Sequence, residues 1–205
     1  MNFKKPAAET LYRRVDETAD ELFYREPRFV AHIDAATIAA LTEFYREFLT
    51  PGSDVLDLMS SWISHLPEEV PLGRVAGLGM NEAELAANPQ LTDHLVHNLN
   101  DEATLPYPDE SFDRVNIVVS IQYLVQPEAV LSSVRQVLRD KGAVCIAMSH
   151  RLFPTKAIMA FQELPASQRV ALVAGHLERA GFKDIEFIDR SPANADPLWL
   201  LVARR

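Results

Sequence analysis

The sequence predicts an α/β fold, in which a doubly wound and mostly parallel sheet of seven strands carries helices on both faces and ends in an antiparallel hairpin. Three observations predict it. Apolar, strand-like segments alternate with amphipathic helical segments from residue 51 onward. Two of these strands, FDRVNIVVS and GAVCIAMS, are apolar almost throughout, as is typical of strands buried on both faces. The last two strands, KDIEFIDR and PLWLLVARR, are joined by a short loop and therefore pair antiparallel.

The first 50 residues are expected to form an N-terminal helical extension. Asp34 is a good N-cap, and the segment AATIAALTEFYREFL after it has helical apolar spacing until PGS ends it. Four apolar residues fall on one face of this helix: Ile38, Leu41, Tyr45 and Phe48. The more polar region of residues 7 to 24 is also predicted to be helical, with a break at EPRF.

From residue 51 onward, strands and helices are expected to follow one another. The first three strands are SDVLDL, GRVAGLGM and HLVHNLN, and a helix starting near Ser64 is expected between the first two, with Pro67 in its first turn. The segment PEAVLSSVRQVLR has helical spacing and lies between the fourth and fifth strands. A last helix from about Ser167 to Ala180 ends at Gly181, where a left-handed C-cap is favoured.

Composition narrows the function classes. A chain of 205 residues with 48% hydrophobic residues can bury a full core, and no apolar run reaches the roughly 20 residues that span a bilayer. The start, MNFKKPAAETLYRR, has no apolar segment typical of a secretory signal, so we expect a cytoplasmic protein without membrane association. A net charge of -9 without a basic block argues against nucleic acid as a partner. The sequence says nothing about oligomeric state.

Cysteine and histidine patterns argue against a metal site. Cys145 is the only cysteine and lies in an apolar run, where a buried thiol is expected. Asp93, His94 and His97 include ligand types, but on a strand residues three apart point to opposite faces. We therefore expect no metal.

Five segments, taken in order, resemble the class I S-adenosylmethionine-dependent methyltransferases of the small-molecule type. They are VLDL, GRVAGLGMNEAEL, NDEATLPYPDESFDRV, VSIQYLVQPEAVLSSVRQVLRDKGAVCIAMS and HLERAGFKDIEFI, and the similarity covers roughly residues 52–205. LPYPDESFDRV and VLRDKGAVCIA are the most specific. The resemblance implies a Rossmann-like cofactor-binding domain over residues 51–205, with residues 1–50 as an extension that serves as a lid. It also implies that S-adenosyl-L-methionine is the cofactor and that the methyl group goes to a small-molecule acceptor.

The resemblance also suggests residues of the cofactor site. Asp57 corresponds to the acid near the methionine amine of the cofactor. Asp101, with Glu102 beside it, corresponds to the acid that accepts from the adenine amino group. Ser120 ends the fourth strand, where the family lines the methyl-transfer site. These positions agree with the general rule that ligands of open α/β sheets lie outside the carboxyl ends of the strands.

The turn after the first strand departs from the family pattern. The family reads roughly GxGxG there, whereas this chain has Met59, Ser61 and Ile63. Because non-glycine residues at positive φ are strained, we expect the turn to follow another path. Ser60 and Ser61 then supply hydroxyls and amides before the expected helix, whose N-terminus favours a carboxylate. Trp62 either stacks on the ligand or packs into the core or against the N-terminal helices.

The end of the second strand departs as well. The family has a ribose-binding acid where this chain has Gly79. Asn81 is the candidate to bind ribose hydroxyls, and the missing side chain of Gly79 could let the adenosine approach closely. The alternative is that both are simply turn residues.

Candidate acceptor residues follow the fourth and fifth strands and precede the first. Tyr123 is expected to orient the acceptor and His150 to serve as a base. The residues expected to bind the acceptor are Gln122, Arg151, Lys156, Tyr24, Arg28 and His32, each of which could instead be solvated or locally paired.

Two other functions remain to be weighed. The missing glycines and ribose acid favour a methyltransferase-like fold that does not methylate and acts as a binding or regulatory partner. A nucleotide-cofactor dehydrogenase is disfavoured, because the chain ends in a hairpin and lacks GxGxxG.

Overall fold

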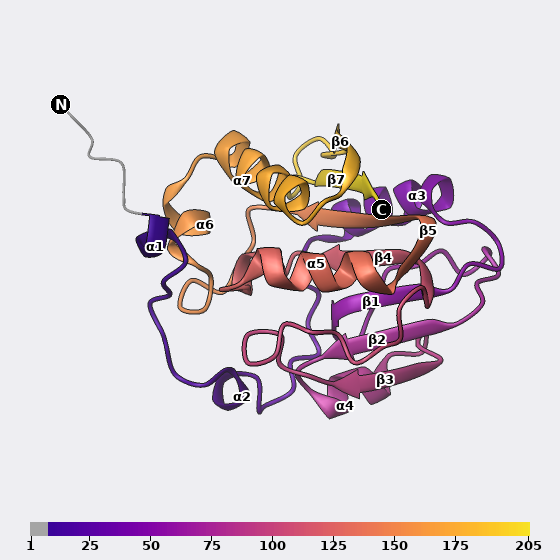
Figure 1. The fold of residues 1–205 in the computed structure, drawn as a ribbon, viewed down its shortest axis with the longest axis horizontal. Coiled ribbons are helices and arrows are strands. Elements are labelled where there is room, and N and C mark those ends of the chain that lie inside the picture. The colour runs from indigo at the N-terminus through magenta and orange to yellow at the C-terminus, as the bar shows by residue number, and fades with distance from the viewer. Residues whose placement is uncertain (1–7) are drawn as a thin grey trace.

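The computed structural model describes residues 8–205 and contains one seven-stranded sheet (Figure 1). The strands are β1 Val55–Ser60, β2 Val75–Gly79, β3 Asp93–Val96, β4 Phe112–Val118, β5 Leu138–Met148, β6 Lys183–Asp189 and β7 Trp199–Arg204. Their order is β3-β2-β1-β4-β5-β7-β6. The first five strands are mutually parallel, and β7 lies antiparallel between β5 and β6. The predicted mostly parallel sheet with a terminal hairpin is confirmed.

Helices cover both faces of the sheet. They are α1 Ala8–Leu11, α2 Asp20–Phe23, α3 Ala35–Phe48, α4 Glu82–Ala87, α5 Pro127–Val137, α6 Met159–Glu163 and α7 Ala166–Arg179, with a 3-10 turn over Ile121–Tyr123. Figure 1 shows α5 and α7 on one face and α3 on the other. Asp34 caps α3 as predicted, since its carboxylate accepts from the Thr37 amide at 2.9 Å. Gly181, at φ +88°, ends α7 as predicted.

The core has two layers because side chains alternate across the strands. Leu56 and Leu58 of β1 belong to the layer beneath α5 and α7. Val55 of the same strand belongs to the layer beneath α3, together with the thiol of Cys145, which is fully buried as expected. The sheet is therefore packed on both faces. The carboxyl ends of its parallel strands remain as the place for a functional site.

No helix forms between β1 and β2, contrary to the expectation. Residues 61–74 are irregular. His65 has a φ of +58°, which a right-handed helix does not allow, and Leu66 is followed by Pro67, which disfavours helical backbone at Leu66. The Gln90 amide holds Leu66 at both its backbone N–H and its carbonyl, at 3.2 and 2.7 Å. Hydrogen bonds from the Gln90 side chain thus take the place of backbone hydrogen bonds that a helix would make at Leu66.

The N-terminal region is less helical than predicted. Only α1 and α2 form within residues 8–24, and the chain between and after them is irregular. Asp16 bends the chain by accepting from both the amide and the hydroxyl of Thr18, at 2.9 and 2.6 Å. We call residues 12–33 the strap. None of the helices within residues 8–205 has the length and apolar character to cross a membrane.

Candidate active site

A cavity of about 290 Å³ lies at the carboxyl ends of β1, β2 and β4, beneath the strap. This is the place where open α/β sheets bind ligands. Its walls come from the strap, the turn after β1, the start of α4, the loop after β3, the end of β4 and the loop after β5. The lining residues with side chains of chemical interest are Asp20, Tyr24, His32, Asp57, Ser60, Ser61, His65, Asn81, Glu84, Asn98, Asn100, Ser120, Tyr123, Arg151 and Phe153.

Asp57 is a buried carboxyl group at the centre of the cavity wall. It is 4% exposed, and its Oδ2 accepts from the hydroxyls of Ser60 and Ser64 at 2.5 and 2.6 Å. Burial raises its pKa to about 6, although the two hydroxyl bonds partly oppose that rise. Within residues 8–205, Oδ1 has no hydrogen-bond partner. A cationic ligand group would therefore find a carboxyl group with one oxygen still available.

Strained backbone gathers at this cavity. Met59, His65 and Val119 have φ values of +60°, +58° and +48°, and all three line it. Non-glycine residues pay about 1 to 3 kcal/mol for such a conformation. Met59 therefore does take a left-handed conformation without glycine, at the position of the family's first glycine, and the β1–β2 register shifts between Leu58 and Ser60 beside it. Such strain persists only where the surrounding structure imposes it, as ligand sites commonly do.

The ends of β1 and β2 approach each other closely at Gly79. A Cβ on Gly79 would meet the Ser60 carbonyl oxygen at 2.3 Å. The absence of a side chain at Gly79 therefore serves strand packing.

Asn81 fastens the strap to α4. Its side-chain oxygen accepts from the Glu84 amide at 3.1 Å, and its Nδ2 donates to the carbonyls of Tyr24 and Arg25 at 2.9 and 3.0 Å. Glu84 extends this connection, because its carboxylate accepts from Ser61 Oγ and from the Arg28 amide, both at 2.6 Å. Both donors of Asn81 are thus already used by the protein.

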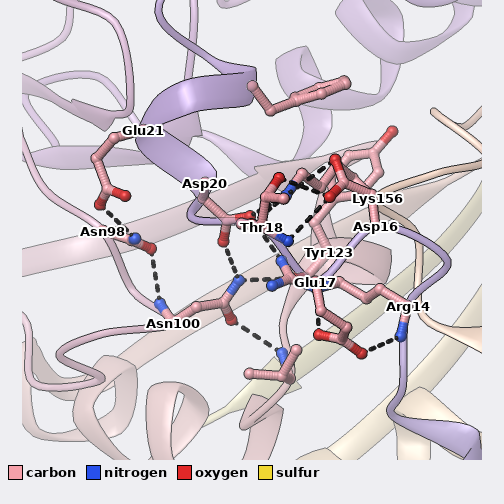
Figure 2. Close-up of polar contacts among 12 residues, drawn as sticks. Arg14, Asp16, Glu17, Thr18, Asp20, Glu21, Asn98, Asn100, Tyr123 and Lys156 are labelled. Atoms are coloured by element: carbon pink, nitrogen blue, oxygen red, sulfur yellow. Dashed lines mark hydrogen bonds and ion pairs between the residues drawn. The ribbon is translucent and has the colours of Figure 1, made fainter.

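A second polar cluster holds the start of the strap, as Figure 2 shows. Asp20, 5% exposed, accepts from Arg14 at 2.7 Å and from the Asn100 amide at 2.8 Å, and pairs with Lys156 at 3.2 Å. Lys156 is completely buried and also donates to the Thr18 carbonyl at 2.5 Å. The prediction that Lys156 binds the acceptor is corrected, since its ammonium group is committed to the strap and it does not line the cavity.

Aromatic side chains form the wall nearest β4 and β5. The Tyr123 hydroxyl accepts from the Phe153 amide at 2.8 Å, and the two rings stack with centroids 5.9 Å apart. His32 packs edge-on against Phe153 at 5.5 Å. Beside them, the Ser120 hydroxyl is buried and has no hydrogen-bond partner in the described part of the chain. A buried polar group that the protein leaves unpaired suits a ligand atom.

The cavity brings together most of the residues predicted for it. Lining it are Asp57, Ser60, Ser61, Gly79, Asn81, Ser120, Tyr123, Arg151, Tyr24 and His32. Outside its lining are Trp62, Asp101, Glu102, Gln122, His150 and Arg28. Their cofactor or acceptor assignments therefore stay predictions that the lining does not support.

The loop after β3 explains why Asp101 and Glu102 lie outside the cavity lining. Asp101 and Glu102 are exposed, and Asp101 accepts from Asn98 at 2.9 Å. The chain turns so that Asn98, Leu99 and Asn100 face the cavity instead. A motif aligned by sequence cannot resolve such a shift of one or two residues in a turn.

Local partners explain why Trp62, Gln122 and His150 lie outside the cavity lining. Trp62 donates from Nε1 to the Val30 carbonyl at 3.0 Å, so it packs against the strap, the alternative that the sequence left open. Gln122 donates to the carbonyls of Val119 and Arg151 at 2.7 and 3.2 Å. His150 is half exposed and pairs with Asp196 at 3.0 Å.

Arg28 has partners of its own. It donates to the Phe23 carbonyl at 2.8 Å and lies over the Phe23 ring at 4.4 Å. Its guanidinium group thus stabilises the strap, as a stacked arginine does.

Sequence reasoning missed Asp20 and Glu84. Asp20 and Glu84 sit on helices of four and six residues whose polarity reads as an exposed face. Only the docking of the strap buries them. No metal cluster accompanies these acids, because within residues 8–205 no three His, Cys, Asp or Glu side chains are grouped to hold an ion.

Comparisons with known proteins agree with this geometry. A family model described as "Methyltransferase domain" matches residues 60–146. An S-adenosylmethionine-dependent methyltransferase from Mesorhizobium loti is 19% identical with a TM-score of 0.61, over 81% of this chain and 98% of that one. Phosphoethanolamine N-methyltransferase 2 from Haemonchus contortus, solved with S-adenosyl-L-methionine, is 16% identical with a TM-score of 0.59, over 82% and 52%.

The same architecture occurs with another chemistry. The [4+2]-cyclase SpnF is 16% identical with a TM-score of 0.62, over 80% of each chain. A search of curated proteins gave no match. At these identities the solved structures establish the fold.

Proposed function

Since the chain carries a class I S-adenosylmethionine-dependent methyltransferase domain, we propose that it binds S-adenosyl-L-methionine in the cavity and transfers the methyl group to a small-molecule acceptor. The observation that carries the proposal is the enclosed cavity at the carboxyl ends of β1, β2 and β4, with an available Asp57 oxygen and the unpaired Ser120 hydroxyl.

The charges of the lining support this cofactor. The lining contains the acids Asp20, Asp57 and Glu84 and one guanidinium group, that of Arg151. Arg14 and Lys156 pair with Asp20 from outside the lining, which leaves Asp57 and Glu84 as its acids without a cationic partner among the described residues. S-adenosylmethionine has a sulfonium, an ammonium and a carboxylate, and so one net positive charge. An acidic, partly enclosed cavity attracts such a cation more strongly than water does.

Each end of the cavity offers suitable groups for part of the cofactor. Asp57 would hold the ammonium group. Glu84 would accept from ribose hydroxyls, because its carboxylate is nearly buried beside the end of β2 and each oxygen can accept a second bond. Asn98 and Asn100 would border the adenine. The bound cofactor supplies a reactive methyl group on a sulfonium leaving group.

The acceptor has the remaining space beside Tyr24, Tyr123 and Phe153. The protein's task there is to align the acceptor atom about 3 Å from the methyl carbon and to exclude water. Both tasks suit aromatic walls and a strap that closes the cavity. A small acceptor fits this proposal, because the cofactor itself fills much of the volume.

Calorimetric titration with S-adenosylmethionine and S-adenosylhomocysteine tests the proposal. We expect both to bind with micromolar dissociation constants, and Asp57→Ala to weaken both by roughly 10- to 100-fold, the usual loss for a hydrogen bond to a charged group. Asp101→Ala is the matched control, because this acid is exposed outside the cavity, and should bind as the wild type does. No binding at millimolar concentration would sink the proposal.

A fold without methyl transfer is the second candidate. The glycine-free turn and the missing helix after β1 favour it, as does the cyclase that shares the architecture. Cofactor binding without methyl transfer to any member of a small-molecule acceptor panel would support this candidate.

A further inference from the structure

His65 combines three features that its fold role does not explain. Its backbone is left-handed, at φ +58°, where glycine would avoid the strain. Its Nδ1 is buried and has no hydrogen-bond partner among residues 8–205, and the side chain lines the cavity. A strained backbone that carries an unpaired buried nitrogen costs stability twice, so a ligand contact is the natural explanation.

His32 lines the same part of the cavity from the strap. Burial lowers the pKa of both imidazoles, that of His65 to about 4, with the nearby His32 as its second cause. Two charged groups also act on the pKa of His32: Glu84 raises it and Arg28 lowers it. Within residues 8–205 neither ring makes a hydrogen bond. Both rings are therefore neutral near pH 7, and each has one N–H to donate.

The two imidazoles line the same cavity as Asp57. Ser64, the residue before His65, donates its hydroxyl to Asp57 at 2.6 Å. A carboxyl group and imidazole N–H groups thus line one cavity. This pairing is complementary to an α-amino acid group, whose ammonium and carboxylate are attached to the same carbon.

Within residues 8–205, the lining offers that carboxylate no helix N-terminus after β1 and only one guanidinium group. No helix follows β1 in this chain, so no helix N-terminus offers its amides. Arg151, the guanidinium group of the lining, has a side chain that is 57% exposed and is held by Asp196 at 2.9 Å. The remaining charged groups of the lining are acids, which repel a carboxylate.

We propose that His65 and His32 bind the carboxylate of the α-amino acid end of the cofactor, while Asp57 binds its ammonium group. This inference rests on the proposed function, because it assigns residues to the same cofactor. It makes the imidazole pair a substitute for the glycine-rich turn and helix that this chain lacks.

The test compares two ligands by calorimetry: S-adenosylhomocysteine and its decarboxylated analogue, in which hydrogen replaces the carboxylate. We expect the wild type to prefer S-adenosylhomocysteine by at least 10-fold. His65→Gly should reduce that preference at least 5-fold, while its affinity for the decarboxylated analogue stays within 2-fold. Glycine is chosen because it accepts the left-handed backbone, so the variant should fold.

Three further variants distinguish a direct contact with the ligand carboxylate from a general effect on the structure of the cavity. His32→Phe keeps the edge-on packing against Phe153 and should also reduce the preference. His65→Asn, which tolerates positive φ and has N–H donors, should recover part of it. His97→Ala changes another histidine of the lining, whose Nε2 is already engaged with the Glu102 carbonyl at 2.8 Å, and should alter both dissociation constants by the same factor.

The outcomes distinguish the histidine assignment from the proposed function. A wild-type preference that persists in both His65→Gly and His32→Phe would overturn the histidine assignment and leave the proposed function standing. Failure of S-adenosylhomocysteine to bind the wild type would refute the proposed function and the assignment together.

Discussion

Asp57 makes the stability of the folded protein depend on pH in an unusual direction. Its carboxyl loses its proton near pH 3.8 in the unfolded chain but near pH 6 in the folded protein. The folded state therefore holds one more proton between these values, and stability present below pH 3.8 is lost as the pH rises through 6. A difference of about two pKa units corresponds to about 3 kcal/mol.

Asp57→Asn should remove this loss. Relative to wild type, the variant should gain up to about 3 kcal/mol of unfolding free energy between pH 4 and pH 7, since an amide has no proton to lose. Urea unfolding at pH 4, 5, 6 and 7 measures the difference. Asp54→Asn is the control: bonds from the Arg74 amide and Arg139 lower the pKa of Asp54 below 3.8, so its stabilising contribution is complete above about pH 4. This variant should therefore be less stable than wild type by a nearly constant amount from pH 5 to pH 7. A difference for Asp57→Asn that does not vary with pH would contradict the prediction.

Gly79 tests the close approach of two strand ends. Gly79→Ala should lower the unfolding free energy by about 1 to 3 kcal/mol, because its Cβ would meet the backbone oxygen of Ser60, which cannot move alone. Urea midpoints report the loss. The control is Gly175→Ala in α7, where the nearest atoms belong to the flexible Arg179 side chain and alanine should stabilise the helix by about 0.5 to 1 kcal/mol. Equal effects of the two substitutions would be inconsistent with this account.

At the scale of elements, the strap is held by polar groups that it buries on docking. Asp20 and Lys156 anchor its start, and Asn81 and Glu84 hold its middle. Few apolar side chains take part, since Val15, Leu22, Phe29 and Val30 remain exposed. The strap should therefore open more easily than the sheet, which would admit ligands to the cavity.

Lys156→Met is expected to loosen the strap. The change leaves the buried Asp20 without its second cation, and breaking a buried pair costs about 3 to 5 kcal/mol. Hydrogen exchange should then be faster in residues 12–33 than in wild type, with β4 and β5 nearly unchanged. Lys183→Met, at an exposed position of β6, is the matched control and should leave strap exchange unchanged. Equal acceleration in all elements would show that Lys156 supports the whole fold instead.

At the scale of the molecule, the cavity joins the strap to the sheet. A ligand that touches both should stabilise them together. At a concentration 100-fold above its dissociation constant, S-adenosylhomocysteine should add about 2.7 kcal/mol. For a chain of this size that raises the melting temperature by roughly 5 to 10 °C.

Thermal unfolding with and without the ligand measures this shift. Asp57→Ala should show a smaller shift at the same ligand concentration, because its affinity is lower. A full shift in the variant would move the ligand away from Asp57.

The predictable part of the fold followed from periodicity and caps. The helix after Asp34, the helix ended by Gly181 and the apolar strands β4 and β5 depend on contacts close in sequence or on burial on both faces. The absent helix after β1 was not predictable, since the Gln90 side chain and a left-handed His65 decide that segment. Glu84 lines the cavity and Asp101 does not, for a related reason: which acid faces a cavity depends on how a turn and a strap dock.

By itself, the sequence determined the order of strands and helices, the mostly parallel sheet with its terminal hairpin and the edge at which a ligand belongs. These properties depend on side-chain patterning, which the chain carries locally. Tertiary structure alone decided which polar groups line the cavity, because the strap and the turn after β1 are held by bonds between residues far apart in the chain. Burial in the folded chain then shifted the pKa values of Asp57, His32 and His65, on which the proposed cofactor site depends.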